Sequence, residues 1–293
     1  MSSVTFRTVS DAGPLPVVVV GAGAMGRAWL GAVAASPDVV LAGVVDLDAD
    51  AARAAADTAP GALAGTDLAA VAAASGARAV IDVTSPAAHL PVTLQALALG
   101  LPVLGEKPAA ASVAEALRLA AAAEHAGQLF MVSQSRSHHR QLRAFRDRAR
   151  RLGRLGVLTT EFFRAPRFGG FRDTMAHPLL LDMAIHPFDA ARYVLDAEPV
   201  SVRCEEFNPS WSWYAGDAAA TAVFEMTGGV RYVYTGSWCG PGLETSWNGG
   251  WRLSGEHGTA TWDGEGPPRV SSDPDADADL DPPAPDDGPQ DIA

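Results

Sequence analysis

A glycine-rich run near the start of the chain has the residue types and the spacing to bind phosphate groups. It follows the apolar stretch Val17–Val20 and has the pattern G-x-G-x-x-G. At this spacing the first glycine permits a tight turn, the second lets the backbone approach a pyrophosphate, and the third lets a helix pack closely on the strand. The helix that begins there offers unpaired N–H groups to the phosphates. The residues predicted to bind a dinucleotide are Gly21, Gly23, Ala24, Met25 and Gly26.

A carboxylate follows the next apolar run, Val39–Val45, at the position where a ribose is bound in such folds. Asp46 lies 20 residues after Gly26. It can accept hydrogen bonds from ribose hydroxyls, and it would repel a 2′-phosphate. Asp46 could instead cap the following helix, but Asp48 stands directly before Ala49 and is the better N-cap. The sequence therefore favours NAD over NADP as the cofactor.

The chain has a single lysine, Lys107, among its 22 lysine and arginine residues. It lies in Gly105-Glu106-Lys107-Pro108, after a short predicted strand around Val103. A lysine carries a compact charge whose pKa burial and neighbours can lower, so it suits a site that stabilises or protonates a reacting oxygen. An ordinary exposed lysine is the alternative interpretation.

A carboxylate and a histidine stand four residues apart in the second half of the chain. Asp182 and His186 would share one helical face, with Asp189 nearby. A carboxylate that orients an imidazole is a general-base arrangement, although a surface ion pair has the same spacing. Because Pro187 would disrupt the middle of a helix, we expect this segment in a first turn or at a kink.

A third segment, Thr84-Ser85-Pro86-Ala87-Ala88-His89, fits a helix N-cap followed by a first-turn proline. The loop at Thr84 then lies at the carboxyl end of a strand, where ligands bind in parallel sheets. The cofactor-binding residues predicted in addition to the glycine run and Asp46 are Thr84, Ser85, Pro86, His89, Glu106 and Lys107.

With these motifs in this order, residues 15 to 265 resemble the Gfo/Idh/MocA family of NAD(P)-dependent oxidoreductases, which act mostly on sugars and cyclic polyols. The resemblance implies that Lys107, Asp182 and His186 are catalytic and line a substrate pocket beside the nicotinamide. It implies hydride transfer at a secondary alcohol, with His186 as general base and Lys107 stabilising the developing alkoxide. It also suggests a cis bond before Pro108.

Two other functions remain open alongside a sugar or inositol-like polyol dehydrogenase. One is a non-catalytic regulatory protein of the same fold that binds a dinucleotide and a sugar. The other is redox-assisted glycoside cleavage with bound NAD, which the family resemblance permits. Fold alone does not decide among them, and the substrate's name and the direction of the reaction stay open.

The segments that must position these residues alternate between strands and helices. Such alternation predicts an α/β fold with a doubly wound parallel Rossmann sheet. The expected strands are 17–20, 39–45, 79–83, a short one around 103, and 129–132, and the expected helices are 27–35, 49–59, 86–99 and 112–126.

After about residue 155 the pattern changes to alternating runs with a Gly228-Gly229 turn, which predicts a C-terminal α+β domain with a mixed, largely antiparallel sheet. The expected boundaries are 1–132 for the dinucleotide-binding domain, 133–270 for a substrate and oligomerisation domain, and 271–293 for an acidic tail. The proline and aspartate of that tail predict disorder. Family members usually continue past Trp262 with more sheet and a final helix, so we expect either a trimmed domain or a truncated chain.

Composition and charge bear on the possible partners, and they argue only weakly against nucleic acid. Eight of the 34 acidic residues lie in 271–293, so most of the net charge of −12 belongs to the tail. Arginines between 140 and 154 flank an apolar helical stripe and are expected to be solvated, not to bind nucleic acid. Two cysteines suit neither a disulfide framework nor a zinc site, and no metal is predicted. We expect a cytoplasmic protein without a membrane span, and the C-terminal sheet is a candidate homo-oligomer surface.

The loop before Asp182 carries four further cationic or titratable side chains that could contact an acidic or phosphorylated substrate. They are Arg164, Arg167, Arg172 and His177. Six of the seven tryptophans lie between 211 and 262, where packing is a more common role for them than stacking on a sugar.

Overall fold

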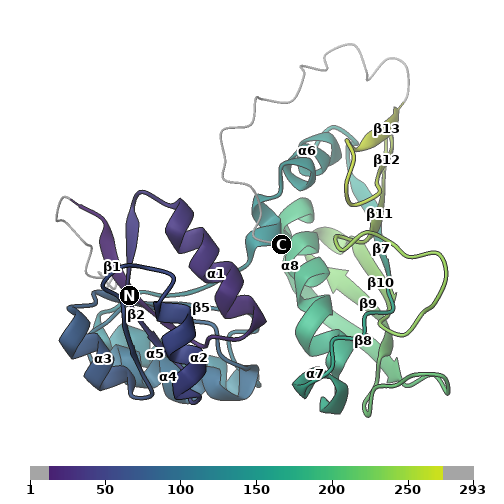
Figure 1. Ribbon diagram of the computed structural model, residues 1–293. Helices are drawn as coiled ribbons and strands as arrows, with labels where there is room; N and C mark the ends of the chain where they lie inside the picture. The colour runs from purple at the N-terminus through teal and green to yellow at the C-terminus, as the bar shows by residue number, and fades with distance from the viewer. Residues whose placement is uncertain (1–12, 273–293) are drawn as a thin grey trace. The chain divides into compact units, whose positions relative to one another are not determined.

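The computed structural model describes residues 13–272, and they divide into two compact units between Ser133 and Gln134. Each unit has its own sheet and its own core (Figure 1). Within the described range, no helix has both the length and the apolar character needed to cross a membrane.

The first unit contains a six-stranded sheet in the order β3-β2-β1-β4-β5-β6, and all of its strand pairs are parallel. This is the strand order of a dinucleotide-binding Rossmann fold. The strands are β1 Leu15–Val20, β2 Val39–Val45, β3 Leu63–Gly65, β4 Ala79–Asp82, β5 Val103–Gly105 and β6 Phe130–Val132.

Helices cover both faces of this sheet, which explains the unbroken apolar run of β1. Val17 and Val19 pack on one face against α1 and α2, whereas Val18 and Val20 pack on the other against α3, α4 and α5. Side chains alternate between the faces of a strand, so a strand buried on both sides must be apolar throughout. The helices are α1 Ala24–Ala35, α2 Ala49–Ala56, α3 Leu68–Ser75, α4 Pro86–Ala98 and α5 Val113–Ala126.

The predicted strands and helices of this unit are all present, and the differences lie at their ends. The first helix begins at Ala24 rather than Arg27, so the second half of the glycine motif belongs to the helix itself. The second helix ends at Ala56 rather than Ala59. The sequence analysis missed β3 and α3, which connect β2 to β4.

The second unit contains a seven-stranded mixed sheet in the order β13-β12-β11-β7-β10-β9-β8. Only β7 and β10 pair in parallel, so the sheet is largely antiparallel, as the alternating runs predict. The strands are β7 Leu155–Phe163, β8 Pro199–Phe207, β9 Ala219–Met226, β10 Arg231–Ser237, β11 Gly250–Gly255, β12 Gly258–Trp262 and β13 Arg269–Ser272.

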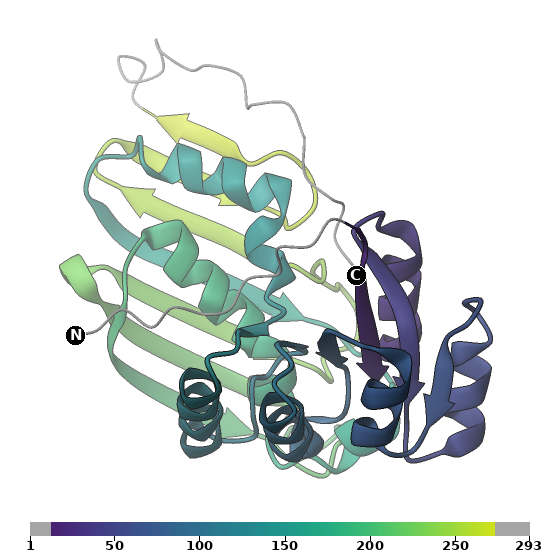
Figure 2. The same cartoon turned by 90° about the vertical axis from the view of Figure 1, so that its left-hand side faces the viewer.

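One face of this second sheet is covered by helices, and Figure 2 shows α6 and α8 lying across it. Trp251 of the sheet packs there against Phe145 of α6, and Tyr232 stacks on Trp251. The helical segments are the 3₁₀ turns η1 Ser135–His138 and η3 Thr227–Gly229, the π-helix η2 Leu179–Ala184, and the α-helices α6 Arg140–Ala149, α7 Phe171–Thr174 and α8 Ile185–Leu195.

The predicted tail boundary needs a small correction. Ser271 and Ser272 belong to β13, because they pair with Thr259 and Gly258 of β12 and extend the sheet. The remainder of the predicted disordered segment lies outside the described residues.

Candidate functional site

Four loops of the first unit emerge at one edge of its sheet. In the register of the parallel strands, Val20 of β1 pairs with Val45 of β2 and with Asp82 of β4, and Asp82 pairs with Gly105 of β5. The carboxyl ends of these strands are therefore level. The segments that follow them begin at Gly21, Asp46, Val83 and Glu106, with Thr84 next after Val83. The structure thus brings the predicted cofactor-binding segments of this unit to a common edge.

The glycine run needs glycine for a different reason at each position. Gly21 has φ +107°, and a Cβ there would lie 2.7 Å from the carbonyl oxygen of Val83. A Cβ on Gly26 would collide with the Gly21 carbonyl. At Gly23, the N-cap of α1, a Cβ would meet nothing within 4 Å. The loop is thus closed tightly against β4 and α1, but it is open on the Gly23 side.

This open side fits the phosphates of a dinucleotide. The residues that follow Gly23, Ala24 and Met25, are exposed, and no side chain caps the N-terminus of α1. The first N–H groups of a helix have no partner within the helix, so here they remain available to an anion. These backbone groups would hold the pyrophosphate.

Asp46 connects the glycine loop to the end of β2. Its Oδ2 accepts a hydrogen bond from Ala22 N at 2.7 Å, and its Oδ1 accepts one from Asp48 N at 2.9 Å. Asp48 caps α2, as predicted, by accepting from the N–H groups of Asp50 and Ala51. A carboxylate has about four acceptor positions. Asp46 therefore retains acceptor capacity for ribose hydroxyls while it fixes the loop.

The Thr84 loop is organised by Asp82, a buried aspartate that the sequence analysis missed. Asp82 Oδ1 accepts hydrogen bonds from Thr84 Oγ1 at 2.6 Å and from Thr84 N at 3.1 Å, and Oδ2 accepts from Thr93 Oγ1 at 3.1 Å. Burial raises the pKa of Asp82, and the hydrogen bonds from Thr84 oppose that shift. The sequence signal that could have identified Asp82 is an aspartate at the end of a buried strand, shortly before a Thr-Ser-Pro turn.

Ser85 is the N-cap of α4 and Pro86 is its first residue, as the sequence predicts. The Ser85 side chain makes no capping hydrogen bond and is exposed. Its hydroxyl therefore lies at the sheet edge without serving the helix, in keeping with the predicted cofactor role.

His89 connects two of the loops. Its Nδ1 lies 2.7 Å from the carbonyl oxygen of Pro108, and its Nε2 lies 3.0 Å from that of Thr84. The side chain is only 2% exposed. A buried ring whose two nitrogens face backbone carbonyls positions the loops, so any effect of His89 on the cofactor passes through Thr84 and Pro108.

Glu106 and Lys107 follow β5, and the Lys107–Pro108 bond is cis, as the resemblance suggested. Glu106 Oε1 accepts a hydrogen bond from the Trp29 indole of α1 at 2.8 Å, and its Oε2 accepts from Lys107 N at 3.1 Å. These contacts fix the backbone that carries Lys107. The Lys107 side chain is partly exposed.

Asp182 and His186 lie in the second unit at an irregular point of a helix. Asp182 belongs to the π-helix η2, and His186 is the second residue of α8. Pro187 lies in the first turn of α8, as predicted. A π-turn is often found at functional sites. Both side chains are buried, with Asp182 4% and His186 8% exposed.

Arg172 forms an ion pair with Asp182, at 2.6 Å from Nε to Oδ2. The guanidinium also lies over the rings of Phe168 and Phe171. In the sequence, Arg172 is one of four loop residues predicted as possible substrate contacts. The pairing with Asp182 was hidden, because a ten-residue separation with a π-turn shows no helical periodicity.

The other three residues of that group also have partners within the second unit. Arg164 pairs with Glu244 at 2.9 Å, Arg167 lies over the Trp213 ring at 3.9 Å, and His177 Nδ1 lies 2.9 Å from Glu206 Oε2. These contacts give each side chain a structural role, so the hypothesis of a cationic substrate loop gains no support.

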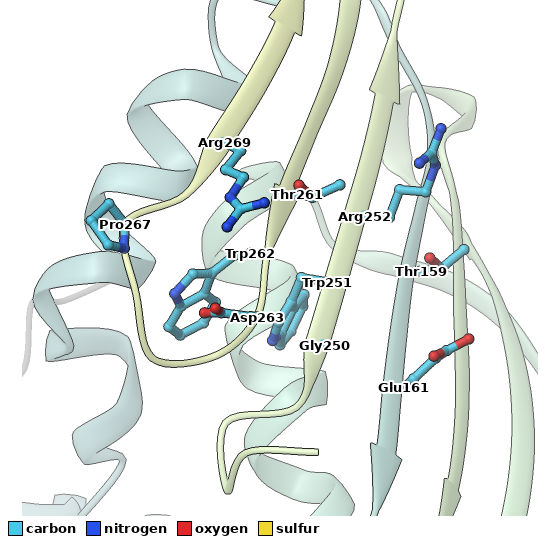
Figure 3. Close-up of a pocket in the computed structure, with 10 residues that line it drawn as sticks. All are labelled: Thr159, Glu161, Gly250, Trp251, Arg252, Thr261, Trp262, Asp263, Pro267 and Arg269. Carbon is cyan, nitrogen blue, oxygen red and sulfur yellow. The ribbon is translucent and has the colours of Figure 1, made fainter. Parts of the chain in front are cut away.

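The helix-free face of the second sheet contains a pocket of about 450 Å³, shown in Figure 3. The side chains of Arg252 on β11 and Arg269 on β13 lie on either side of β12, and Asp263 lies on the loop that closes the pocket. None of the predicted site residues lines it.

Comparison with known sequences gives the family. The pattern described as "Oxidoreductase family, NAD-binding Rossmann fold" matches residues 15–134, and the pattern described as "GFO/IDH/MocA C-terminal domain" matches residues 126–261. The chain belongs to the Gfo/Idh/MocA oxidoreductase family. Its first unit is an NAD-binding Rossmann fold, and its second is the C-terminal domain of the family.

Relatives within the Gfo/Idh/MocA family carry names of sugar and polyol enzymes. The chain is 32% identical over 192 residues to an inositol 2-dehydrogenase of Renibacterium salmoninarum, an alignment that covers 64% of this chain and 56% of that enzyme. It is 29% identical over 251 residues to a dTDP-3,4-didehydro-2,6-dideoxy-α-D-glucose 3-reductase of Streptomyces violaceoruber, covering 81% and 69%. The chain spans about half the length of several curated relatives that it matches.

Among solved structures, GenD2 from gentamicin A biosynthesis in complex with NAD superposes with a TM-score of 0.75 at 26% identity. The match covers 89% of this chain and 75% of that one. The likeness extends over both units of this Gfo/Idh/MocA chain and includes a neighbour solved with NAD.

Proposed function

We propose that the chain is an NAD-dependent dehydrogenase that acts on a secondary alcohol of a sugar or an inositol-like cyclic polyol. The observation that carries the proposal is the sheet edge at which the open glycine loop, Asp46, the Thr84 loop and Glu106-Lys107 come together. The names of the inositol and dideoxy-sugar relatives support the substrate class.

The preference for NAD rests on Asp46. Its carboxylate is fixed beside the glycine loop by Ala22 N, and a second negative side chain, Asp48, lies two residues further on. A 2′-phosphate brought to this position would face two carboxylates. The same carboxylate can accept hydrogen bonds from the two ribose hydroxyls of NAD.

The catalytic roles follow the family resemblance. Bound NAD supplies the hydride acceptor at its nicotinamide. We assign His186 as the general base that takes the proton of the substrate hydroxyl. Asp182 orients His186 or binds a neighbouring hydroxyl, and Lys107 stabilises negative charge on the reacting oxygen. The buried ion pair between Arg172 and Asp182 holds that carboxylate in place.

Two further proposals concern the setting of the protein. Both cysteines of the chain, Cys204 and Cys239, are free thiols, which supports the expected cytoplasmic location. The helix-free face of the second sheet is the surface proposed for homo-oligomer formation, and Val157 and Val223 are 42% and 41% exposed on it.

The first experiment is a fluorescence titration of the full chain with NADH and, separately, with NADPH. Energy transfer from tryptophan reports binding, and Trp29 contacts Glu106 at the proposed site. We expect saturable binding that favours NADH, followed by NAD reduction with one or more polyols or sugars. An Asp46→Ala variant should lose the preference for NADH. Folded protein that bound neither cofactor would contradict the proposal, and binding without turnover would favour the regulatory alternative.

A further inference from the structure

Three side chains with metal-binding atoms converge in the second unit, and none of them is among the residues assigned to catalysis. They are His177, between α7 and η2, Glu206 on β8, and Asp217 before β9. One ligand atom from each lies within 4.8 Å of the other two. In the described range 13–272, no other group of three His, Cys, Asp or Glu side chains satisfies that condition.

Backbone contacts hold the three segments together independently of the side chains. Asp217 N donates to Ala176 O at 2.9 Å, and Ala215 N donates to Asp173 O at 2.9 Å. Between them, Gly216 lies so close to the carbonyl groups of Met175 and Ala176 that a Cβ would collide with them. The cluster is therefore built by a tight crossing of two loops.

Glu206 anchors the third segment. It pairs with Ala220 in the β8–β9 ladder, which fixes its position relative to Asp217. Its side chain is 18% exposed, and within the described residues no hydrogen-bond donor reaches the buried Oε1. The Glu206 carboxylate lies beside a second carboxylate, and His177 offsets its charge at only one of its two oxygens, Oε2.

We propose that His177, Glu206 and Asp217 bind one divalent metal ion of the Zn²⁺ or Mn²⁺ type. An imidazole nitrogen with two carboxylate oxygens suits these ions, and thiolates are not required. Ligand atoms about 2.1 Å from a metal ion are about 3 to 3.5 Å from one another. Small side-chain rotations bring the three atoms from within 4.8 Å to that spacing.

An ion pair between His177 and Glu206 would account for two of the three residues. Their contact of 2.9 Å needs no metal, and His177 is half-exposed. It does not involve Asp217, whose ligand atom lies within 4.8 Å of those of both other residues, and a cation bound by all three would offset the repulsion between the two carboxylates. The third residue therefore favours a metal site over a simple ion pair.

The proposed ion would stabilise the segment that leads to Asp182. The carbonyl oxygen of His177 accepts a hydrogen bond from Leu181 N, at the start of the π-helix. With its side chain fixed by a metal, His177 would hold the first turn of η2 in place. This role does not depend on the proposed dehydrogenase activity.

The test uses the full chain, freed of metal with a chelator and then titrated with ZnCl₂ or MnCl₂ by calorimetry. We expect saturable binding of one ion per chain for at least one of the two metals. Because an ion that binds the folded state stabilises it, the same metal should raise the melting temperature of the chain. His177→Ala, Glu206→Gln and Asp217→Asn should each abolish the one-to-one binding and the thermal shift.

Glu205→Gln is the matched control, since Glu205 is exposed on the same strand and points to the opposite face. It should bind metal as the unchanged chain does. Cys204→Ser tests the one nearby thiol, and it too should bind normally. The proposal is overturned if neither metal binds, if folded ligand variants bind like the unchanged chain, or if binding is lost only in Cys204→Ser.

Discussion

Lys107 has a chemistry that no other side chain of this protein can duplicate, because all the other basic residues are arginines. We predict that Lys107→Met binds NADH normally but loses nearly all turnover. Lys107→Arg should remain inactive too, because a guanidinium cannot give up its proton and has a different shape. Titration with NADH and steady-state rates on the best polyol measure the two effects. Substantial turnover in Lys107→Met would show that the assigned role is wrong.

Replacing glycine by alanine should affect NADH binding at one position of the glycine loop and stability at another. Gly23 has φ −67° and open space at its Cβ position, so Gly23→Ala should fold with an unchanged melting temperature. It should nevertheless weaken NADH binding, because the methyl group enters the open side of the loop. Gly26→Ala collides with the Gly21 carbonyl and should cost about 1 to 3 kcal/mol of stability.

Thermal unfolding and NADH titration of both variants separate these outcomes. If Gly23→Ala bound NADH as tightly as the unchanged chain, the open side of the loop would not be the phosphate site. If Gly26→Ala were fully stable, the close packing of α1 on the loop would not be required.

At the scale of elements, the junction of η2 and α8 depends on a buried ion pair. Removing the cation leaves the buried carboxylate of Asp182 without its guanidinium partner. Arg172→Met should therefore destabilise the protein by about 3 kcal/mol. Arg167→Met is the matched control, since its loss removes only a contact with the Trp213 ring, worth about 1 kcal/mol. Urea unfolding measures both, and equal effects would contradict the special role of Arg172.

The sequence was most informative where elements are long and apolar. β1 contains the run Val17–Val20 and β2 has no charged or polar side chain, and this is why their parallel sheet was predictable. α3 was missed because Leu68–Ser75 is alanine-rich, with no polar face to reveal a helical period. β8 was missed because its residues are almost all exposed.

The candidate site was predictable where it follows local motifs. The glycine run, Asp46 and the Thr84 turn are each set by a strand end and the helix after it. The pairing of Arg172 with Asp182, and the cluster of His177 with Glu206 and Asp217, join segments that only the folded chain brings together. No local pattern marks such contacts.

At the scale of the whole molecule, we expect copies of the chain to associate through the helix-free face of the second sheet. Light scattering should then give a mass that is a multiple of 30.4 kDa. Val223→Glu places a charge on that face and should lower the mass, whereas Leu243→Glu changes a fully exposed loop residue and should not. A mass of 30.4 kDa for the unchanged chain would rule out this association.

The place of β1 inside its sheet has a consequence for synthesis on the ribosome. Val17 lies between Leu41 of β2 and Ala79 of β4, so one neighbour arrives early and the other much later. Until β4 has left the ribosome, the nascent chain carries an apolar strand with one unpaired edge. Such an edge is prone to join other chains. We therefore expect the nascent chain to be prone to aggregation until β4 has been synthesised.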